Sequence, residues 1–149
     1  IDYAAHEAEE KKLPNVRFAV KDVTHFDKDN IHEQFDLITT FDAVHDQAKP
    51  LNVLKGIYKA LKDDGVYIMQ DIHGSSEVHN NLDHPVGPLL YGISTTHCMT
   101  VSLAQDGDGL GAMWGREKAR ELLSRAGFTK IVIHQLEHDF QNDYYVVQK

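Results

Sequence analysis

Two short apolar segments on either side of one amphipathic helix constrain the fold of this chain most strongly. Leu37–Thr40 and Val66–Met69 are rich in β-branched and aromatic residues, which is typical of buried strands. Between them, from about Ala48 to Lys62, apolar side chains recur at helical spacing, and Pro50 stands in the first turn. The pattern predicts a strand–helix–strand unit with parallel strands, and ligands bind such sheets beyond the carboxyl ends of the strands.

Three polar residues follow these two predicted strands. His45 and Asp46 come after the first strand, and Asp71 ends the second. A histidine with a pKa near neutrality suits removal of a proton from a hydroxyl group, and Asp71 could orient its ring. We expect Asp46 to face the N-terminus of the following helix, where the helix dipole favours an acid. The alternative is that His45 is a hydrogen-bonded packing residue and Asp71 a turn acid, and the residues alone leave both interpretations open.

The residues before this unit predict a surface helix and a further strand. Residues 1–12 are rich in Ala, Glu and Lys and end before Pro14, which indicates a helix. Asn15–Val20 alternates between apolar and polar residues, as a strand does. Residues 24–34 are polar and charged and predict a loop or a short surface turn. Gly65 is expected to supply the left-handed cap that turns the helix into the second strand.

The C-terminal residues predict one helix and an antiparallel hairpin. Arg116–Ala126 places Ala119, Leu122 and Leu123 on one face, with Gly127 as its cap. Strands are expected at Phe128–Leu136 and at 143–147. Helix, strand, turn and strand in this order place the last two strands at one edge of the sheet.

Composition narrows the functional classes. The 149 residues, 42% hydrophobic and 26% charged, fit one globular domain. A formal charge of −8 argues against a nucleic-acid partner. The single cysteine, Cys98, and the lack of a leader or a long apolar run favour a cytoplasmic protein without membrane spans. The oligomeric state is left open.

Several of these segments together resemble a known family. FDLITTFDAVHD at 35–46, the helix ending LKDDG and the strand ending at Asp71 resemble the second half of the class I S-adenosylmethionine-dependent methyltransferase domain. The His45–Asp46 pair is similar to that of small-molecule O-methyltransferases, in which the histidine is the general base. Residues 81–115 resemble a subgroup that carries a winged-helix segment ahead of the catalytic domain. The resemblance implies an α/β, Rossmann-like, mostly parallel sheet with an antiparallel C-terminal edge hairpin.

The resemblance also implies how the cofactor S-adenosylmethionine is bound. It assigns Asp22 to the adenine amino group and Val23 to the face of the adenine ring, and we place Phe41 with them as a cofactor-binding residue. An acidic acceptor suits an exocyclic N–H donor, and a Val suits a flat apolar face. By composition alone, Asp22 also fits an ordinary turn acid at a strand end.

A long insertion follows Asp71, and in the family this position covers the acceptor pocket. We assign it to about residues 73–112 and expect 81–103 to form a partly helical lid or pocket wall. Tyr91, His97 and Trp114 are the candidate contacts with a small-molecule substrate, and packing is the alternative for each. The glycine run Gly107–Gly111 is interpreted as a loop of the insertion, because the family's cofactor glycines follow the first strand. The remaining histidines show no metal-ligand spacing, so no metal site is expected.

The first two strands of the family's sheet, with their glycine loop, have no counterpart in these residues. We therefore interpret residues 1–149 as the C-terminal part of one methyltransferase domain and expect them to bind cofactor weakly when isolated. The function predicted is methyl transfer from S-adenosylmethionine to a small molecule, at a hydroxyl oxygen, with His45 as base. The alternative is a non-catalytic cofactor-sensing or regulatory domain of the same fold. A nicotinamide-dependent reductase is disfavoured because no dinucleotide glycine loop opens a helix here.

Overall fold

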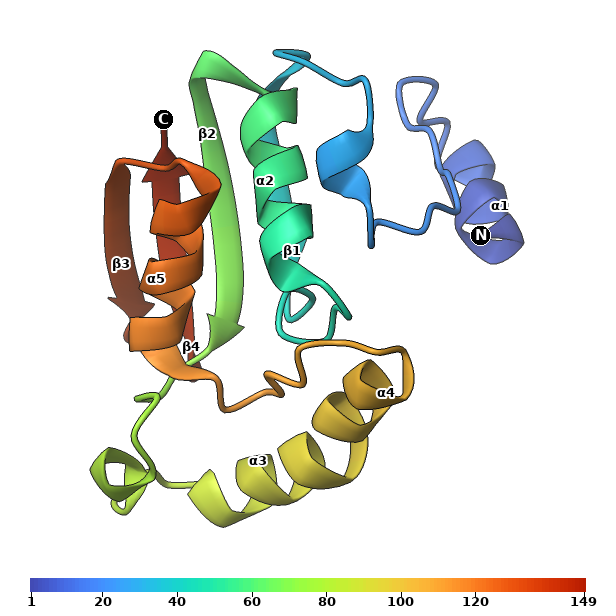
Figure 1. Ribbon diagram of the computed structural model, residues 1–149. Helices are drawn as coiled ribbons and strands as arrows, with labels where there is room; N and C mark the ends of the chain where they lie inside the picture. The colour runs from blue at the N-terminus through green and yellow to red at the C-terminus, as the bar shows by residue number, and fades with distance from the viewer.

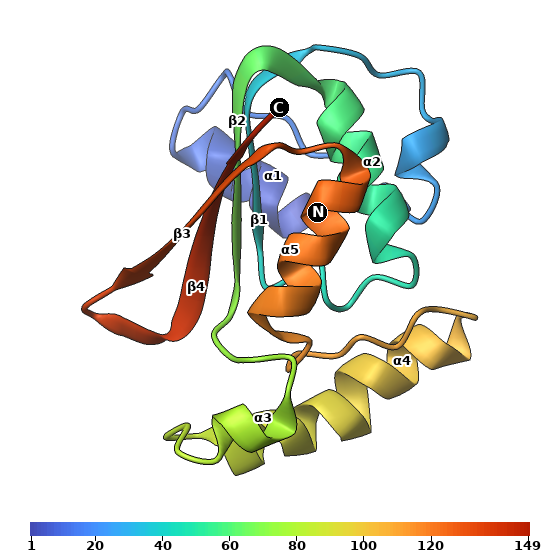
Figure 2. The same ribbon diagram turned by 60° about the vertical axis from the view of Figure 1, so that its left-hand side comes forward.

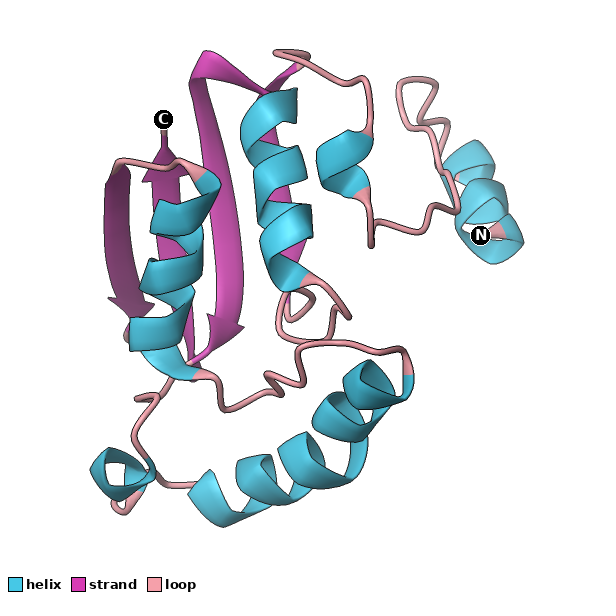
Figure 3. Ribbon diagram, viewed as in Figure 1, coloured by secondary structure: helices cyan, strands magenta, loops and turns pink.

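A computed structural model describes residues 1–149 and shows one sheet with two long helices packed on one of its faces (Figure 1 and Figure 3). The sheet has four strands in the order β1-β2-β4-β3. The strands are β1 (Phe35–Phe41), β2 (Leu61–Ile72), β3 (Lys130–Leu136) and β4 (Asp139–Gln148). The two helices are α2 (Pro50–Ala60) and α5 (Gly115–Ala126).

The sheet confirms both predicted arrangements of strands. β1 and β2 are parallel and joined by α2, and β4 lies antiparallel to both β2 and β3. The turn expected at Gly65 is wrong, because β2 begins directly after α2 and Gly65 lies inside the strand. Leu61 is fully buried and pairs with Phe35, so the chain leaves the helix already extended.

The core lies between the sheet and the two helices. The apolar side chains of α2 face the sheet. At the end of α5, Gly127 caps the helix in the left-handed conformation with φ of 118°. Burial of these side chains is the main stabilising contribution to the fold. The fully or almost fully buried apolar residues include Leu54, Ile57, Leu61, Tyr67, Met69, Leu123, Tyr145 and Val147.

The N-terminal residues contain one predicted helix and lack the predicted strand. The helix α1 (Asp2–Glu10) is confirmed. The strand expected at Asn15–Val20 is wrong: Val16, Phe18 and Val20 are exposed in irregular backbone. An alternating segment forms a strand only beside a partner that takes up its hydrogen bonds, and none lies there.

Residues 73–112, predicted to form an insertion, are largely helical. They contain a 3-10 turn (Val78–Asn81), α3 (Gly87–Ile93), a π-helical turn (Ser94–Cys98) and α4 (Met99–Ala104). The last three run as one bent rod beyond the carboxyl ends of β1 and β2, drawn in yellow in Figure 1 and Figure 2. A second small core of Ile72, Leu90, Cys98, Ala112 and Met113 joins this rod to the sheet. None of the helices has the length and apolar character needed to cross a bilayer.

Candidate active site

The carboxyl ends of β1 and β2 form the floor of the candidate site. Phe41 pairs with Gln70, so the residues that follow each strand emerge side by side. Asp42 turns the chain away from β1 with a positive φ of 44°, a conformation that Asp tolerates better than most residues. Its N–H donates to the Gln70 carbonyl at 3.1 Å, and Nε2 of Gln70 donates to its carboxylate at 3.2 Å. This turn carries His45 back over the end of β2.

His45 and Asp71 are brought together as the sequence predicts. Nδ1 of His45 lies 2.7 Å from Oδ1 of Asp71, and both side chains are buried. The same oxygen accepts the Ile72 N–H at 2.9 Å and the indole N–H of Trp114 at 3.1 Å. Because two unambiguous donors already converge on Oδ1, the carboxylate acts as an acceptor towards His45 and the proton resides on Nδ1. In neutral His45 the free lone pair is therefore on Nε2.

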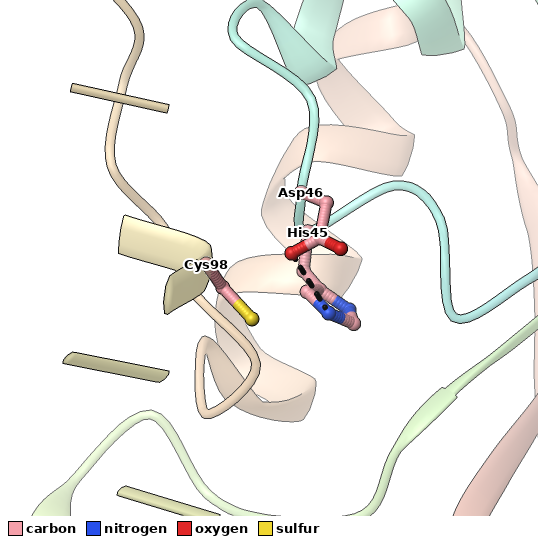
Figure 4. Close-up of side chains that lie close together, drawn as sticks. All are labelled: His45, Asp46 and Cys98. Carbon is pink, nitrogen blue, oxygen red and sulfur yellow. Dashed lines mark ion pairs between the residues drawn. The ribbon is translucent and has the colours of Figure 1, made fainter. Parts of the chain in front are cut away.

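Asp46 lies beside that lone pair. Its Oδ1 is 3.3 Å from Nε2 of His45, so the expectation that Asp46 faces the N-terminus of α2 is wrong. The helix begins at Pro50, four residues later, and has no side-chain cap. Cys98, from the π-helical turn of the insertion, points its sulfur toward the same place (Figure 4). No motif in the sequence points to chemistry at Cys98.

The charges around His45 set its protonation. Burial by itself would lower the pKa of His45, but the hydrogen bond and negative charge of Asp71, with the charges of Asp46 and Asp42, outweigh it and raise the pKa. Burial, with the neighbouring Asp46, raises the pKa of Cys98 to about 11. Compared with the same groups in water, these surroundings stabilise the protonated ring of His45 and the protonated thiol of Cys98.

Of the three residues predicted to bind the cofactor, Asp22, Val23 and Phe41, only Val23 lines a pocket beside β1. An apolar pocket of about 200 Å³ opens between the loop containing Val23, β1 and α2. Asp22 is exposed beside it, and its Oδ1 accepts the Thr24 N–H at 2.8 Å, which leaves its other oxygen free. Phe41 is 62% exposed at the end of β1. An apolar slot with an adjacent carboxylate fits a purine ring and its amino group. The pocket is lined by Val23, Phe26, Ile38, Thr40, Ala43, Val44, Gln47, Val53 and Ile57.

The three predicted substrate contacts are placed differently from one another. Tyr91 is half-buried, and its hydroxyl is 2.8 Å from Nδ2 of Asn81. His97 is exposed on the π-helical turn. Trp114 is buried in the core, where it donates to Asp71, so its place is behind the histidine rather than on a pocket wall. The glycine run lies in the connection after α4, where Gly109 and Gly111 take positive φ values of 62° and 71°.

A partly buried ion pair at the start of α5 is not evident from the sequence. Both oxygens of Asp143, a fully buried residue of β4, accept hydrogen bonds from the Arg116 guanidinium. This hydrogen bonding raises the pKa of Arg116. The pair links the first turn of α5, which follows Trp114 directly, to β4. The two partners are 27 residues apart, and no local pattern pairs them.

Comparisons with known proteins agree with this architecture. A family described as "Methyltransferase domain" matches residues 1–127. No curated protein sequence matches the chain. An O-methyltransferase family protein from Burkholderia thailandensis superposes with a TM-score of 0.71 at 13% identity, over 99% of this chain and 40% of that one.

Two further solved structures share the fold. PigF with SAH gives a TM-score of 0.64 at 19% identity, over 98% of this chain and 40% of that one. The CurJ carbon methyltransferase gives 0.64 at 16% identity, over 97% and 38%. This chain thus spans about two fifths of the length of these structures. At such identities the likeness establishes the fold, and the oxygen and carbon methyltransferases among the matches share it. With the family match over residues 1–127, the sheet order and the helical insertion identify this chain as a member of the class I S-adenosylmethionine-dependent methyltransferase family.

Proposed function

We propose that the protein containing this chain transfers a methyl group from S-adenosylmethionine to a hydroxyl oxygen of a small molecule, with His45 as general base. The observation that carries the proposal is the buried hydrogen bond between His45 and Asp71 at the carboxyl ends of β1 and β2. It holds the imidazole in one tautomer and leaves Nε2 as the proton acceptor. Residues 73–112 would act as the insertion of one methyltransferase domain and cover the acceptor.

The sulfonium cofactor supplies an electrophilic methyl group, and the transfer is an in-line displacement. The protein's residues then have two tasks: to align the acceptor oxygen and to take its proton as the new O–C bond forms. Nε2 of His45 would take that proton, and the carboxylate of Asp71 would stabilise the imidazolium. The proton would leave to water once the ether product is released. Trp114 would act as a positioning residue, because it holds Asp71 and stays behind the ring.

Cofactor binding would use the apolar pocket beside β1. The free oxygen of Asp22 would accept a hydrogen bond from the adenine amino group, and Val23 would pack on the ring. Phe41, at the end of β1, would be the third residue to contact the cofactor. On the acceptor side, Tyr91 and His97 would contribute from the insertion.

A substrate hydroxyl reaches Nε2 only if Asp46 moves. The His45 side chain is 5% exposed and that of Asp46 is 42% exposed, so the carboxylate is the outer of the two groups. Rotation of the Asp46 side chain into solvent would open Nε2 to the acceptor without disturbing the Asp71 contact. A carboxylate that departs in this way would also lower the pKa of His45, which makes the ring a better match for a base at neutral pH.

The test is methyl transfer to a set of phenols by the protein and by its His45→Ala, His45→Gln and Asp71→Asn variants. General base catalysis contributes roughly 10²–10⁴-fold. We therefore expect kcat to fall by about that factor in the His45 variants, with cofactor binding by calorimetry unchanged. His6→Ala, at an exposed residue of α1, is the matched control and should retain the rate. A His45 variant that keeps the wild-type kcat would remove the base assignment.

One observation favours a second candidate, a cofactor-sensing domain without turnover. His45 lies beneath Asp46 and is almost completely buried, as a histidine with a packing role is. Under this alternative the protein binds S-adenosylmethionine, transfers no methyl group to any phenol, and loses stability rather than activity in His45→Ala.

A further inference from the structure

We propose that Nε2 of His45, Oδ1 of Asp46 and Sγ of Cys98 form a binding site for a thiophilic divalent cation such as Zn²⁺. One nitrogen, one oxygen and one sulfur atom lie within 4.8 Å of one another (Figure 4). They come from two segments 52 residues apart, the loop after β1 and the π-helical turn of the insertion. The site goes beyond the proposed methyl transfer and does not depend on it.

The arrangement behind His45 is that of a metal-binding histidine. Ligating histidines commonly donate their second ring N–H to a buried carboxylate, which fixes the tautomer and aims the other nitrogen at the metal. Here Asp71 is that carboxylate, at 2.7 Å, and Trp114 holds it in place at 3.1 Å. Nε2 is thus aimed at Asp46 and Cys98 before any ion arrives.

A positive charge between Nε2 of His45 and Oδ1 of Asp46 would stabilise both atoms. In neutral His45 the lone pair of Nε2 faces Oδ1 of Asp46 at 3.3 Å, and that oxygen is buried without a hydrogen-bond partner. An unpaired buried oxygen facing another lone pair is costly, and a proton or a metal ion relieves it. With bonds of about 2.0–2.2 Å, the nitrogen and oxygen of a tetrahedral zinc site stand roughly 3.3–3.5 Å apart, close to the spacing already present.

The set of ligand atoms selects the kind of cation. Thiolate and imidazole favour Zn²⁺ over Mg²⁺ and Ca²⁺, which prefer oxygen ligands. Three protein ligands leave a fourth position open, as in zinc sites that bind an exchangeable water. Cys98 reaches the ion by rotation of its side chain and gives up its thiol proton on binding. The neighbouring group of Asp42, His45 and Asp71 is a poorer site, because Nδ1 of His45 already donates to Asp71.

The π-helical turn accounts for the position of Cys98. Such turns interrupt α-helices frequently at functional sites, and this one spans Ser94–Cys98. It leaves Cys98 buried on the side that faces the sheet, while the preceding His97 is exposed. Entry for the ion remains open on the side of Asp46, whose side chain is 42% exposed.

Occupancy of this site and general-base catalysis by His45 exclude each other. The ion uses the lone pair on Nε2 that would otherwise accept the substrate proton. A protein loaded with Zn²⁺ would therefore be unable to use His45 as a base until the ion leaves.

The test is titration of the protein, stripped with a chelator, with Co²⁺ and then with Zn²⁺. Co²⁺ bound by a thiolate gives a sulfur-to-cobalt charge-transfer absorption, and Cys98 is the sole cysteine of this chain. We expect this absorption to saturate at one equivalent and to disappear when Zn²⁺ displaces Co²⁺. Cys98→Ala should abolish the absorption, and Asp46→Asn and His45→Gln should each weaken binding at least tenfold. His97→Ala, the exposed neighbour of Cys98, is the matched control and should bind as the wild type does.

Several results would overturn the site. One is that the wild type shows no thiolate absorption with Co²⁺. Another is that Cys98→Ala keeps the wild-type affinity for Zn²⁺, measured by competition with a chromophoric chelator. The third is that His97→Ala weakens metal binding as much as the variants of the proposed ligands do. Circular dichroism confirms that each variant is folded before it is titrated. A methyl-transfer rate that survives His45→Ala would overturn the proposed base and leave this site standing, so the two failures are distinguishable.

Discussion

At the scale of single residues, the site depends on Asp71. Its Oδ1 accepts from His45, Trp114 and the Ile72 N–H, and its other oxygen is buried without a partner. A buried carboxylate persists only when donors compensate its lost hydration. Each donor therefore contributes to stability as well as to the direction of the imidazole ring.

Replacement of Trp114 by Phe tests this directly. The variant keeps most of the apolar volume but removes the indole N–H that donates to Asp71 at 3.1 Å. A hydrogen bond to a charged group contributes about 1.5–3 kcal/mol, so we expect the free energy of unfolding in urea to fall by about that amount. Tyr3→Phe, at a residue 80% exposed, is the control and should leave it unchanged. Equal stability of Trp114→Phe and wild type would show that the indole only fills space.

At the scale of elements, two glycines within helices differ in how closely other residues pack against them. In α2, a Cβ on Gly56 would stand 2.5 Å from the ring of Phe26, so the helix and the preceding 3-10 turn (Phe26–Lys28) approach as closely as a glycine allows. In α3, a Cβ on Gly92 would meet nothing within 4 Å.

Alanine at these two positions should therefore have opposite effects. Gly92→Ala should raise the free energy of unfolding by about 0.5–1 kcal/mol, because alanine loses less backbone entropy on folding than glycine does. Gly56→Ala should lower it by about 1–3 kcal/mol, because Phe26 must move. Urea unfolding of the pair measures both, and changes of the same sign would contradict the packing described for α2.

The elements also show what the sequence could predict. Helical spacing and apolar runs predicted α2, α5, the parallel pair and the C-terminal hairpin, because burial on one face determines each of them. Asn15–Val20 has an equally regular alternation but forms no strand, because pairing depends on a neighbour that local sequence does not reveal. The same limit applies to the site. Strand ends predicted that His45 and Asp71 would meet, whereas the approach of Asp46 and Cys98 depends on how the insertion folds back.

At the scale of the whole molecule, the pocket proposed to bind the cofactor is small and shallow. The pocket beside β1 holds about 200 Å³, below the roughly 300–1,000 Å³ of most ligand sites. The outer edge of β1 pairs with no strand, and Leu37 and Phe41 are 55% and 62% exposed. Nothing within residues 1–149 closes that side.

Isolated residues 1–149 should therefore bind S-adenosylmethionine weakly. A shallow pocket can enclose the adenine ring but buries too little of the rest of the cofactor to offset the entropy lost on binding. Isothermal titration calorimetry of residues 1–149 should give a Kd above about 100 μM. Clearly tighter binding would contradict this description of the pocket.

The role proposed for His45 depends on which of its ring nitrogens exchanges protons. The most direct measurement is a pH titration followed by long-range ¹H–¹⁵N NMR of the His45 ring, on chelator-treated protein. Nδ1 should stay protonated throughout, while Nε2 should titrate with a pKa above the ordinary 6.5, which Asp46→Asn should lower because one of the charges that raise it is gone. A ring that carries its proton on Nε2, or that titrates at Nδ1, would contradict the role given to His45.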